Sequence, residues 1–270
     1  GDLAEKDRYS IPDFPEYEDP NWKAVNTEFT WKGPVERVVE NGIDIAHASF
    51  VHPGFGYPEM ADKARIDKLE RHDTWATTTN ILYPPKLDGG FGLRRFLRKD
   101  KQETIVHNTF YLSGHCIRLH IEINTRMHTL LFDANTPVDE NTTRSFVVQL
   151  RNFFKWDMFD KDSIRRTLKV FEEDAHIVEN ASPNYLPEDL EHEVSVKHDR
   201  FMGTWRSMRR KHVDMGWEID SQAVAAAGGK TVFCIPSPKR LEHPEVDWVL
   251  ETVPLVPVKS KLVIASDQVA

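Results

Sequence analysis

The chain has 270 residues and a formal net charge of −8, with 40% hydrophobic and 29% charged residues. This balance is typical of a globular protein and excludes a disordered chain. The negative charge argues against a partner bound through phosphates, such as a nucleic acid. No apolar run reaches the roughly 20 residues that span a membrane. Two cysteines, Cys116 and Cys234, exclude a disulfide framework and favour a reducing compartment, so we expect a cytoplasmic protein.

Residues 1–23 are predicted to form an irregular arm. Pro12, Pro15 and Pro20 interrupt a segment of acidic and aromatic residues, which makes a poor helix. The chain begins with glycine rather than methionine, so we expect it to be trimmed from a longer protein.

The next segment is predicted to contain a strand and a helix. Residues 24–32 suit a strand, and Gly33-Pro34 then interrupts it. Pro34 fits the first position of a helix, and apolar residues recur every three or four positions until Pro53-Gly54. Residues 54–73 are predicted to be a loop.

The middle of the chain is predicted to be an antiparallel sheet. The expected strands are residues 74–83, 104–112, 116–123, 127–133 and 143–153, with turn residues between 135 and 141. Within one strand Ile117, Leu119 and Ile121 alternate with polar residues, as in a half-buried strand. Short connections favour antiparallel neighbours.

Two long helices are predicted after the sheet. Ile164, Leu168, Phe171, Ala175 and Val178 form one apolar stripe over residues 162–179, and residues 201–215 carry a second. Basic residues line the second helix and either dock an acidic electron donor or form a solvated face: Arg206, Arg209, Arg210 and Lys211. Shorter apolar stretches follow at 247–255 and 261–265. The order of elements predicts a single α+β domain.

One motif carries chemistry, Asp44-x-x-His47-x-x-x-x-His52. Histidines five apart do not share a face of an ideal helix, but they converge if the helix ends or distorts between them. A 2-His-1-carboxylate iron site then needs a carboxylate from elsewhere, for which Asp174 is the first candidate and Glu173 the second. Alternatively both histidines are ordinary structural residues. His115 and His120 repeat the spacing, but strand parity places them on opposite faces.

The run Glu40–His52 resembles the mononuclear-iron motif of the oxygenase component of Rieske non-haem iron oxygenases, which reads Asn-x-x-Asp-x-x-His with a second His four or five residues later. The arm containing Ile11-Pro12 is similar to the segment that leaves the Rieske domain in that family. The acidic helix Phe171–Asp174 resembles the one that provides the third ligand. The resemblance covers most of the chain, and its first motif is the specific one.

The resemblance implies a helix-grip, START-like fold in residues 24–270, a curved antiparallel sheet packed on a long helix around an apolar cavity. It implies Fe(II) held by His47, His52 and Asp174, with Asp44 linking a neighbouring subunit's cluster to a ligand histidine and Asn41 near the iron. It also implies hydroxylation or oxidative demethylation of an aromatic or hydrophobic substrate with O2, as in aromatic hydrocarbon catabolism. Electrons would come from NAD(P)H through a reductase or ferredoxin, in a homotrimer.

One feature departs from the family pattern. A Rieske 2Fe-2S cluster needs Cys-x-His and Cys-x-x-His pairs, and neither Cys116 nor Cys234 begins one. We therefore expect the cluster on a missing N-terminal domain, and we expect this chain to be inactive without it.

Two other functions remain open at this point. A START-like carrier would bind an apolar ligand without any metal, so the motif would be incidental. A metal-dependent hydrolase would use a zinc-bound water, which also requires three protein ligands. The substrate-binding residues are not predicted.

Overall fold

The computed structural model describes residues 9–53, 55, 58–63, 65–83, 103–186, 193–214, 216, 218–235 and 237–257. Contacts divide the chain into two compact units. The larger unit spans Ile11–Trp205, and the smaller combines Gly1–Ser10 with Arg206–Ala270. Within the part of the chain that is described, no helix has the length and apolar character needed to cross a membrane.

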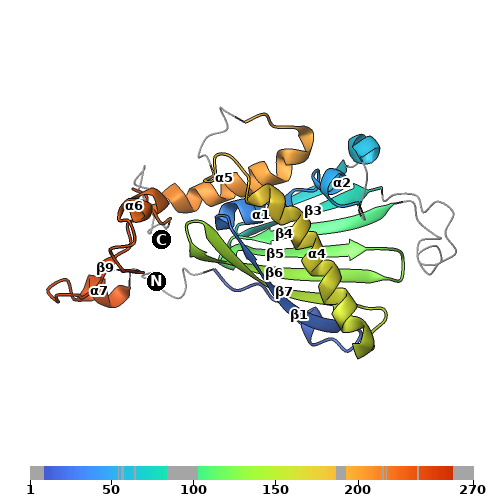
Figure 1. Ribbon diagram of the computed structural model, residues 1–270, viewed down its shortest axis with the longest axis horizontal. Coiled ribbons are helices and arrows are strands. Elements are labelled where there is room, and N and C mark those ends of the chain that lie inside the picture. Colours follow the sequence, from blue (N-terminus) through green and yellow to red (C-terminus); the bar gives the residue numbers. More distant parts are fainter. Residues whose placement is uncertain are drawn as a thin grey trace, which may run out of the picture. The chain divides into compact units, whose positions relative to one another are not determined.

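The larger unit is built on a seven-stranded antiparallel sheet with the order β1-β7-β6-β5-β4-β3-β2 (Figure 1). The strands are β1 (Lys23–Trp31), β2 (Arg65–Arg71), β3 (Trp75–Leu82), β4 (Thr104–Tyr111), β5 (Cys116–Glu122), β6 (His128–Asp139) and β7 (Thr142–Arg151). From β2 to β7, consecutive strands are also neighbours in the sheet. The predicted α+β class with an antiparallel sheet is therefore confirmed.

Two predictions about strands were wrong. β2 lies inside the segment predicted to be a loop, because the charged sequence Arg65–Arg71 at the sheet edge shows no apolar alternation. β6 continues through the predicted turn residues Asn135 and Pro137. Proline is tolerated there because the register shifts between Pro137 and Asp139, beside the hairpin turn.

The main helices are α1 (Val35–Ile43), α2 (Ala48–Val51), α4 (Asp160–Val178) and α5 (Arg200–Asp214). Short 3-10 helices are η2 (Pro15–Tyr17), η3 (Pro58–Lys63), η4 (Ser113–His115), η5 (Asp157–Phe159) and η6 (Lys197–Asp199). Figure 1 shows α4 crossing one face of the sheet, and α1 also contacts β4 to β7 on that side. We call the face covered by α1 and α4 the inner face.

The inner face carries the apolar side chains, as the alternation in β5 predicts. Ile117 is buried in this strand and Leu119 packs on a neighbouring apolar cluster. Trp31, Val38 and Phe171 belong to a core cluster that joins β1, α1 and α4. The residues of opposite parity in β5, including His120, lie on the outer face.

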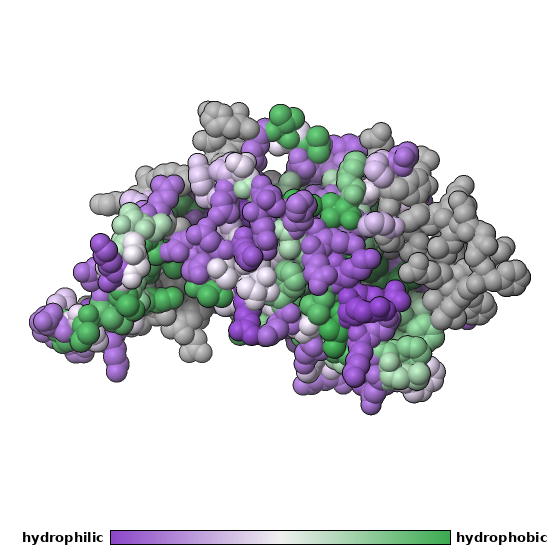
Figure 2. All heavy atoms as spheres, in the orientation of Figure 1, coloured by the Kyte–Doolittle hydropathy of each residue, from purple (hydrophilic) through white to green (hydrophobic). Residues whose placement is uncertain are grey.

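The buried stripe of α4 differs from the predicted one. Its buried residues are Ser163, Thr167, Phe171, Asp174 and Val178, whereas Ile164 and Leu168 are only partly buried. At the start of the helix the buried Ser163 hydroxyl donates a hydrogen bond to Gln149 of β7, at 2.7 Å. The solvent side of α4 is rich in charged residues, and hydrophilic side chains predominate over this helix in Figure 2.

The smaller unit contains the end of α5, α6 (Ser221–Ala226), α7 (Pro238–Glu242) and the parallel pair β8 (Phe233–Cys234) and β9 (Glu251–Thr252). In the basic run of α5, Arg209 forms an ion pair with Glu218. The apolar stretch predicted at 247–255 contains only the short strand β9. The stretch at 261–265 lies outside the described residues.

Candidate metal centre

The chain changes direction between α1 and α2, where the sequence predicted one continuous helix. α1 ends at Ile43 because Asp44 adopts an extended conformation, with ψ 127°. The Asp44 carboxylate then accepts hydrogen bonds from the backbone N–H of Ala46 at 2.7 Å and of His47 at 3.3 Å. Such a turn competes with the helix and starts a new one. His47 immediately precedes α2 and His52 immediately follows it.

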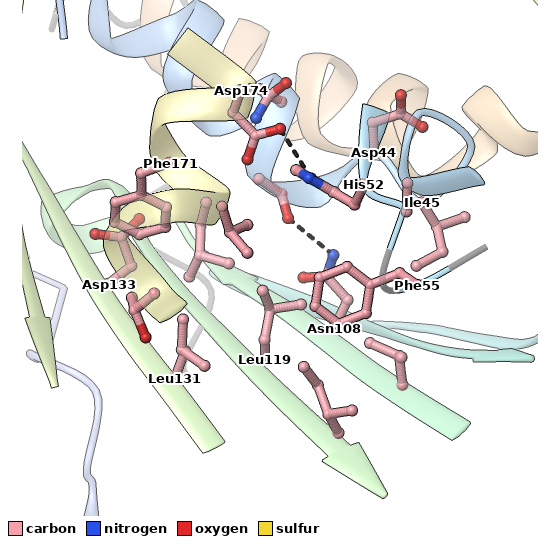
Figure 3. A pocket seen from close by; sticks show the side chains of 18 of the residues that line it. Asp44, Ile45, His52, Phe55, Asn108, Leu119, Leu131, Asp133, Phe171 and Asp174 are labelled. Atoms are coloured by element: carbon pink, nitrogen blue, oxygen red, sulfur yellow. Dashed lines mark hydrogen bonds and ion pairs between the residues drawn. The ribbon is translucent and has the colours of Figure 1, made fainter. Parts of the chain in front are cut away.

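This break brings the two predicted histidines together with the predicted carboxylate. The Nε2 atoms of His47 and His52 are 3.2 Å apart. Oδ1 of Asp174, on the buried face of α4, lies 3.4 Å from Nε2 of His47 and 3.0 Å from Nε2 of His52. Figure 3 shows Asp174 and His52 pointing toward each other from α4 and from the end of α2.

The spacing of these three atoms suits a metal ion. Ligands at about 2.1 Å from one ion in mutually adjacent positions lie about 3.0 Å apart in octahedral geometry and about 3.4 Å apart in tetrahedral geometry. Oδ1 of Asp174 is buried and has no well-formed hydrogen bond among the described residues. A cation between the three atoms would satisfy this oxygen, so the donor set fits the implied iron.

Carboxylates also contact the far side of both imidazoles. Glu173 Oε2 is 2.9 Å from His52 Nδ1, and Asp44 Oδ2 is 3.4 Å from His47 Nδ1. The Glu173 contact is a hydrogen bond that holds the proton of His52 on Nδ1 and leaves its Nε2 lone pair directed at the shared point. Asp44 lies beside Nδ1 of His47 without a well-formed hydrogen bond. Of the two carboxylates that the sequence left open as third ligand, Asp174 reaches that point and Glu173 contacts the opposite nitrogen of His52.

The charges of the site favour a positive occupant. Burial lowers the pKa of His47, but the neighbouring carboxylates of Asp174 and Asp44 outweigh it and raise the pKa to about 9. Burial raises the pKa of Asp44 and of Asp174, yet the neighbouring histidines bring both below their usual value. Without a metal the site therefore holds a proton, with which a metal ion must compete.

A cavity of about 310 Å³ lies between the inner face and the helices, next to this centre. Most of its lining is apolar, from strands β3 to β6 and helices α1 and α4, as in a pocket for a small molecule. The predicted residue Asn41 lines it as well.

Sequence reasoning did not single out two polar residues of this lining, Asn108 of β4 and Asp133 of β6. The signal for Asp133 was present, because it shares strand parity with the apolar Leu131. Asn108 carries the same signal, because it shares strand parity with the apolar Val106 and Phe110.

Comparisons with known proteins agree with this fold. The vanillate O-demethylase oxygenase C-terminal domain family matches residues 31–215. The chain therefore belongs to this family of catalytic domains of Rieske non-haem iron oxygenases.

Methylxanthine N1-demethylase NdmA of Pseudomonas putida is 25% identical over 214 residues, which are 74% of this chain and 54% of that protein. The structure of NdmA with caffeine, from Pseudomonas putida CBB5, covers 74% of this chain and 55% of its own, with 23% identity and a TM-score of 0.57. Dicamba monooxygenase bound to dicamba covers 74% of this chain and 61% of its own, with 18% identity and the same TM-score of 0.57. The chain spans about half the length of the curated relative.

Proposed function

We propose that this chain is the oxygen-activating part of a terminal oxygenase and that His47, His52 and Asp174 hold its Fe(II). The observation that carries the proposal is the approach of two Nε2 atoms and one carboxylate oxygen to within 3.4 Å of one another beside an apolar cavity. Bound Fe(II) would supply dioxygen activation, for which a 2-His-1-carboxylate face leaves positions open.

The protein's own residues would orient and enclose this centre. Glu173 would fix the tautomer of His52, and Asp44 would place a negative charge beside Nδ1 of His47. The aliphatic and aromatic lining would exclude water and hold an aromatic or similarly hydrophobic substrate for hydroxylation or oxidative demethylation. Asn41 would stand at the cavity wall close to the metal.

We infer that electrons reach the centre from a Rieske cluster held outside this sequence, because neither cysteine of the chain begins a cluster motif. Asp44, whose side chain is about a fifth exposed (21%), would connect a neighbouring subunit's cluster to His47. A homotrimer would supply that neighbour, and NAD(P)H would supply the electrons through a reductase or ferredoxin. Residues 1–23 would form the arm that follows the Rieske domain, and residues 24–270 the START-like catalytic domain.

Metal analysis after anaerobic reconstitution with Fe(II) and Zn(II) in competition tests the proposal. We expect about one iron per chain in the native protein and none in Asp174→Ala, with Glu172→Ala, an exposed neighbour on α4, as the matched control. A native protein that binds no metal would indicate a ligand carrier instead, and exclusive retention of zinc would indicate a hydrolase. Either result overturns the proposal.

A further inference from the structure

Asp133 is the third aspartate of the cavity lining, and it stands apart from the metal centre. Figure 3 shows it on the sheet beside Phe171 and Leu131, away from His52 and Asp174. Its partners in the sheet are Ile117 of β5 and Val147 of β7. Both partners are almost fully buried, so the carboxyl group sits among apolar side chains on the inner face.

Among the described residues, no basic side chain forms an ion pair with the Asp133 carboxyl group. Its Oδ1 atom is buried and has no hydrogen-bond partner within the part of the chain that is described. Arg166 is the only arginine or lysine among the described residues that line the cavity. Its side chain is 61% exposed, and its Nε donates to Asp162 at 2.6 Å.

Burial and neighbouring groups together set the charge of Asp133. Burial raises its pKa to about 7, and the side chains of Asn135 and Ser145 offset only part of that effect. A buried carboxyl oxygen without a hydrogen-bond partner, such as Oδ1 of Asp133, is costly, and a ligand that brings a donor or a positive charge removes that cost.

A second acceptor of the cavity wall is also unpaired. Asn108 donates from Nδ2 to the carbonyl oxygen of Gly42 at 3.1 Å, which fixes the orientation of the amide. Its Oδ1 is buried without a partner among the described residues. Carboxylate and amide oxygens accept hydrogen bonds, so the cavity is complementary to a ligand that donates them.

We propose that Asp133 selects the substrate, and that this substrate is a small aromatic-sized molecule whose N–H or ammonium group pairs with Asp133 while its apolar body lies along Leu119, Leu131 and Phe171. The inference rests on the proposed function in one respect, that the cavity is the substrate pocket. It goes further by naming the polar group of the substrate and the residue that recognises it.

Equilibrium binding of three ligands with one ring and different charge tests this proposal. We would titrate the full chain with benzylamine, benzyl alcohol and benzoate at pH 8, by calorimetry or by fluorescence of Trp31, which lines the cavity. Native protein is expected to bind benzylamine at least tenfold more tightly than benzyl alcohol, and benzoate most weakly. Asp133→Asn should abolish the preference for benzylamine.

Asp139→Asn, an exposed aspartate of the same strand, is the matched control and should keep the native order. Equal binding of benzylamine and benzyl alcohol by native protein would overturn the proposal, and so would a preference that survives in Asp133→Asn. If Asp133→Asn does not fold, Asp133→Leu replaces it and should likewise lose the preference for benzylamine. The order in which the native protein binds the three ligands is a test that needs no variant. Iron content is measured on the same samples, so failure of the selectivity and failure of the iron site are separate results.

Discussion

A group of histidines lies on each side of the sheet, and a histidine pKa is raised on the inner side but lowered on the outer side. On the inner side, His47 and His52 meet Asp174, and the pKa of His47 rises to about 9. On the outer face, His120 contacts His128, at 3.0 Å between Nε2 and Nδ1. Burial first, and then the neighbouring His128 and Arg118, lower the pKa of His120 to about 4.

The difference between the faces comes from the carboxylates. On the inner side, carboxylates contact both nitrogens of each histidine, so a positive charge is favoured. On the outer face, the neighbouring Glu122 contacts His107, at 3.0 Å between Oε1 and Nε2. Among the described residues, only the inner group brings three ligand atoms within 4.8 Å of one another. Histidine number alone therefore does not define a metal site.

Removal of the shared carboxylate should have the largest effect on this comparison. Asp174→Ala is expected to weaken iron binding at least 100-fold, because it removes a ligand and the negative charge between two imidazoles. Anaerobic iron titration measures the change. His120→Ala on the outer face is the control and should bind iron like the native chain. Equal losses in both variants would show that the two faces do not differ.

Loss of Glu173, the carboxylate behind His52, should weaken iron binding less than loss of Asp174 does. Glu173→Gln is expected to weaken iron binding about 10-fold to 100-fold, because Glu173 orients His52 without reaching the metal. The same titration, compared with Asp174→Ala, measures this difference. If Glu173→Gln abolished binding and Asp174→Ala did not, the roles of the two carboxylates would be reversed.

Asp133 should make the protein less stable as the pH rises. The pKa of its carboxyl group is about 7 in the folded chain against 3.8 in the unfolded chain, so the folded chain binds the proton more tightly. The stability that protonation of this residue contributes is therefore lost between about pH 4 and pH 7, on the order of 4 kcal/mol. Urea unfolding at pH 5 and pH 8 should show a smaller decrease in Asp133→Asn. If stability decreased by the same amount in the native chain and in Asp133→Asn, the raised pKa of Asp133 would be contradicted.

The outer face should give the smallest effect, and its sign is opposite. The pKa of His120 is lower in the folded chain than its usual 6.5, so the unfolded chain binds the proton more tightly. Stability is then lost as the pH falls from about 6.5 to about 4, on the order of 1 kcal/mol. Urea unfolding of His120→Gln at pH 7 and pH 4.5 should reveal a weaker dependence. A steeper dependence in the variant would contradict this account.

Sequence patterns predicted most of the sheet, because β5 alternates cleanly and its neighbours are joined by short turns. They also predicted the three residues that converge at the centre, since their types and spacing are those of a metal site. The turn at Asp44 was not predicted, because it depends on a carboxylate that bonds to the backbone of Ala46 and His47. The role of Asp133 depends on the apolar side chains of β5 and β7 that surround it, and the sequence of β6 alone does not show which residues these are.

The most direct test of the central claim is an anomalous difference map at the iron edge, from crystals grown anaerobically with Fe(II). The account predicts one peak within bonding distance of Nε2 of His47, Nε2 of His52 and Oδ1 of Asp174. A peak on the outer face between His120 and His128, or no peak at all, would contradict it.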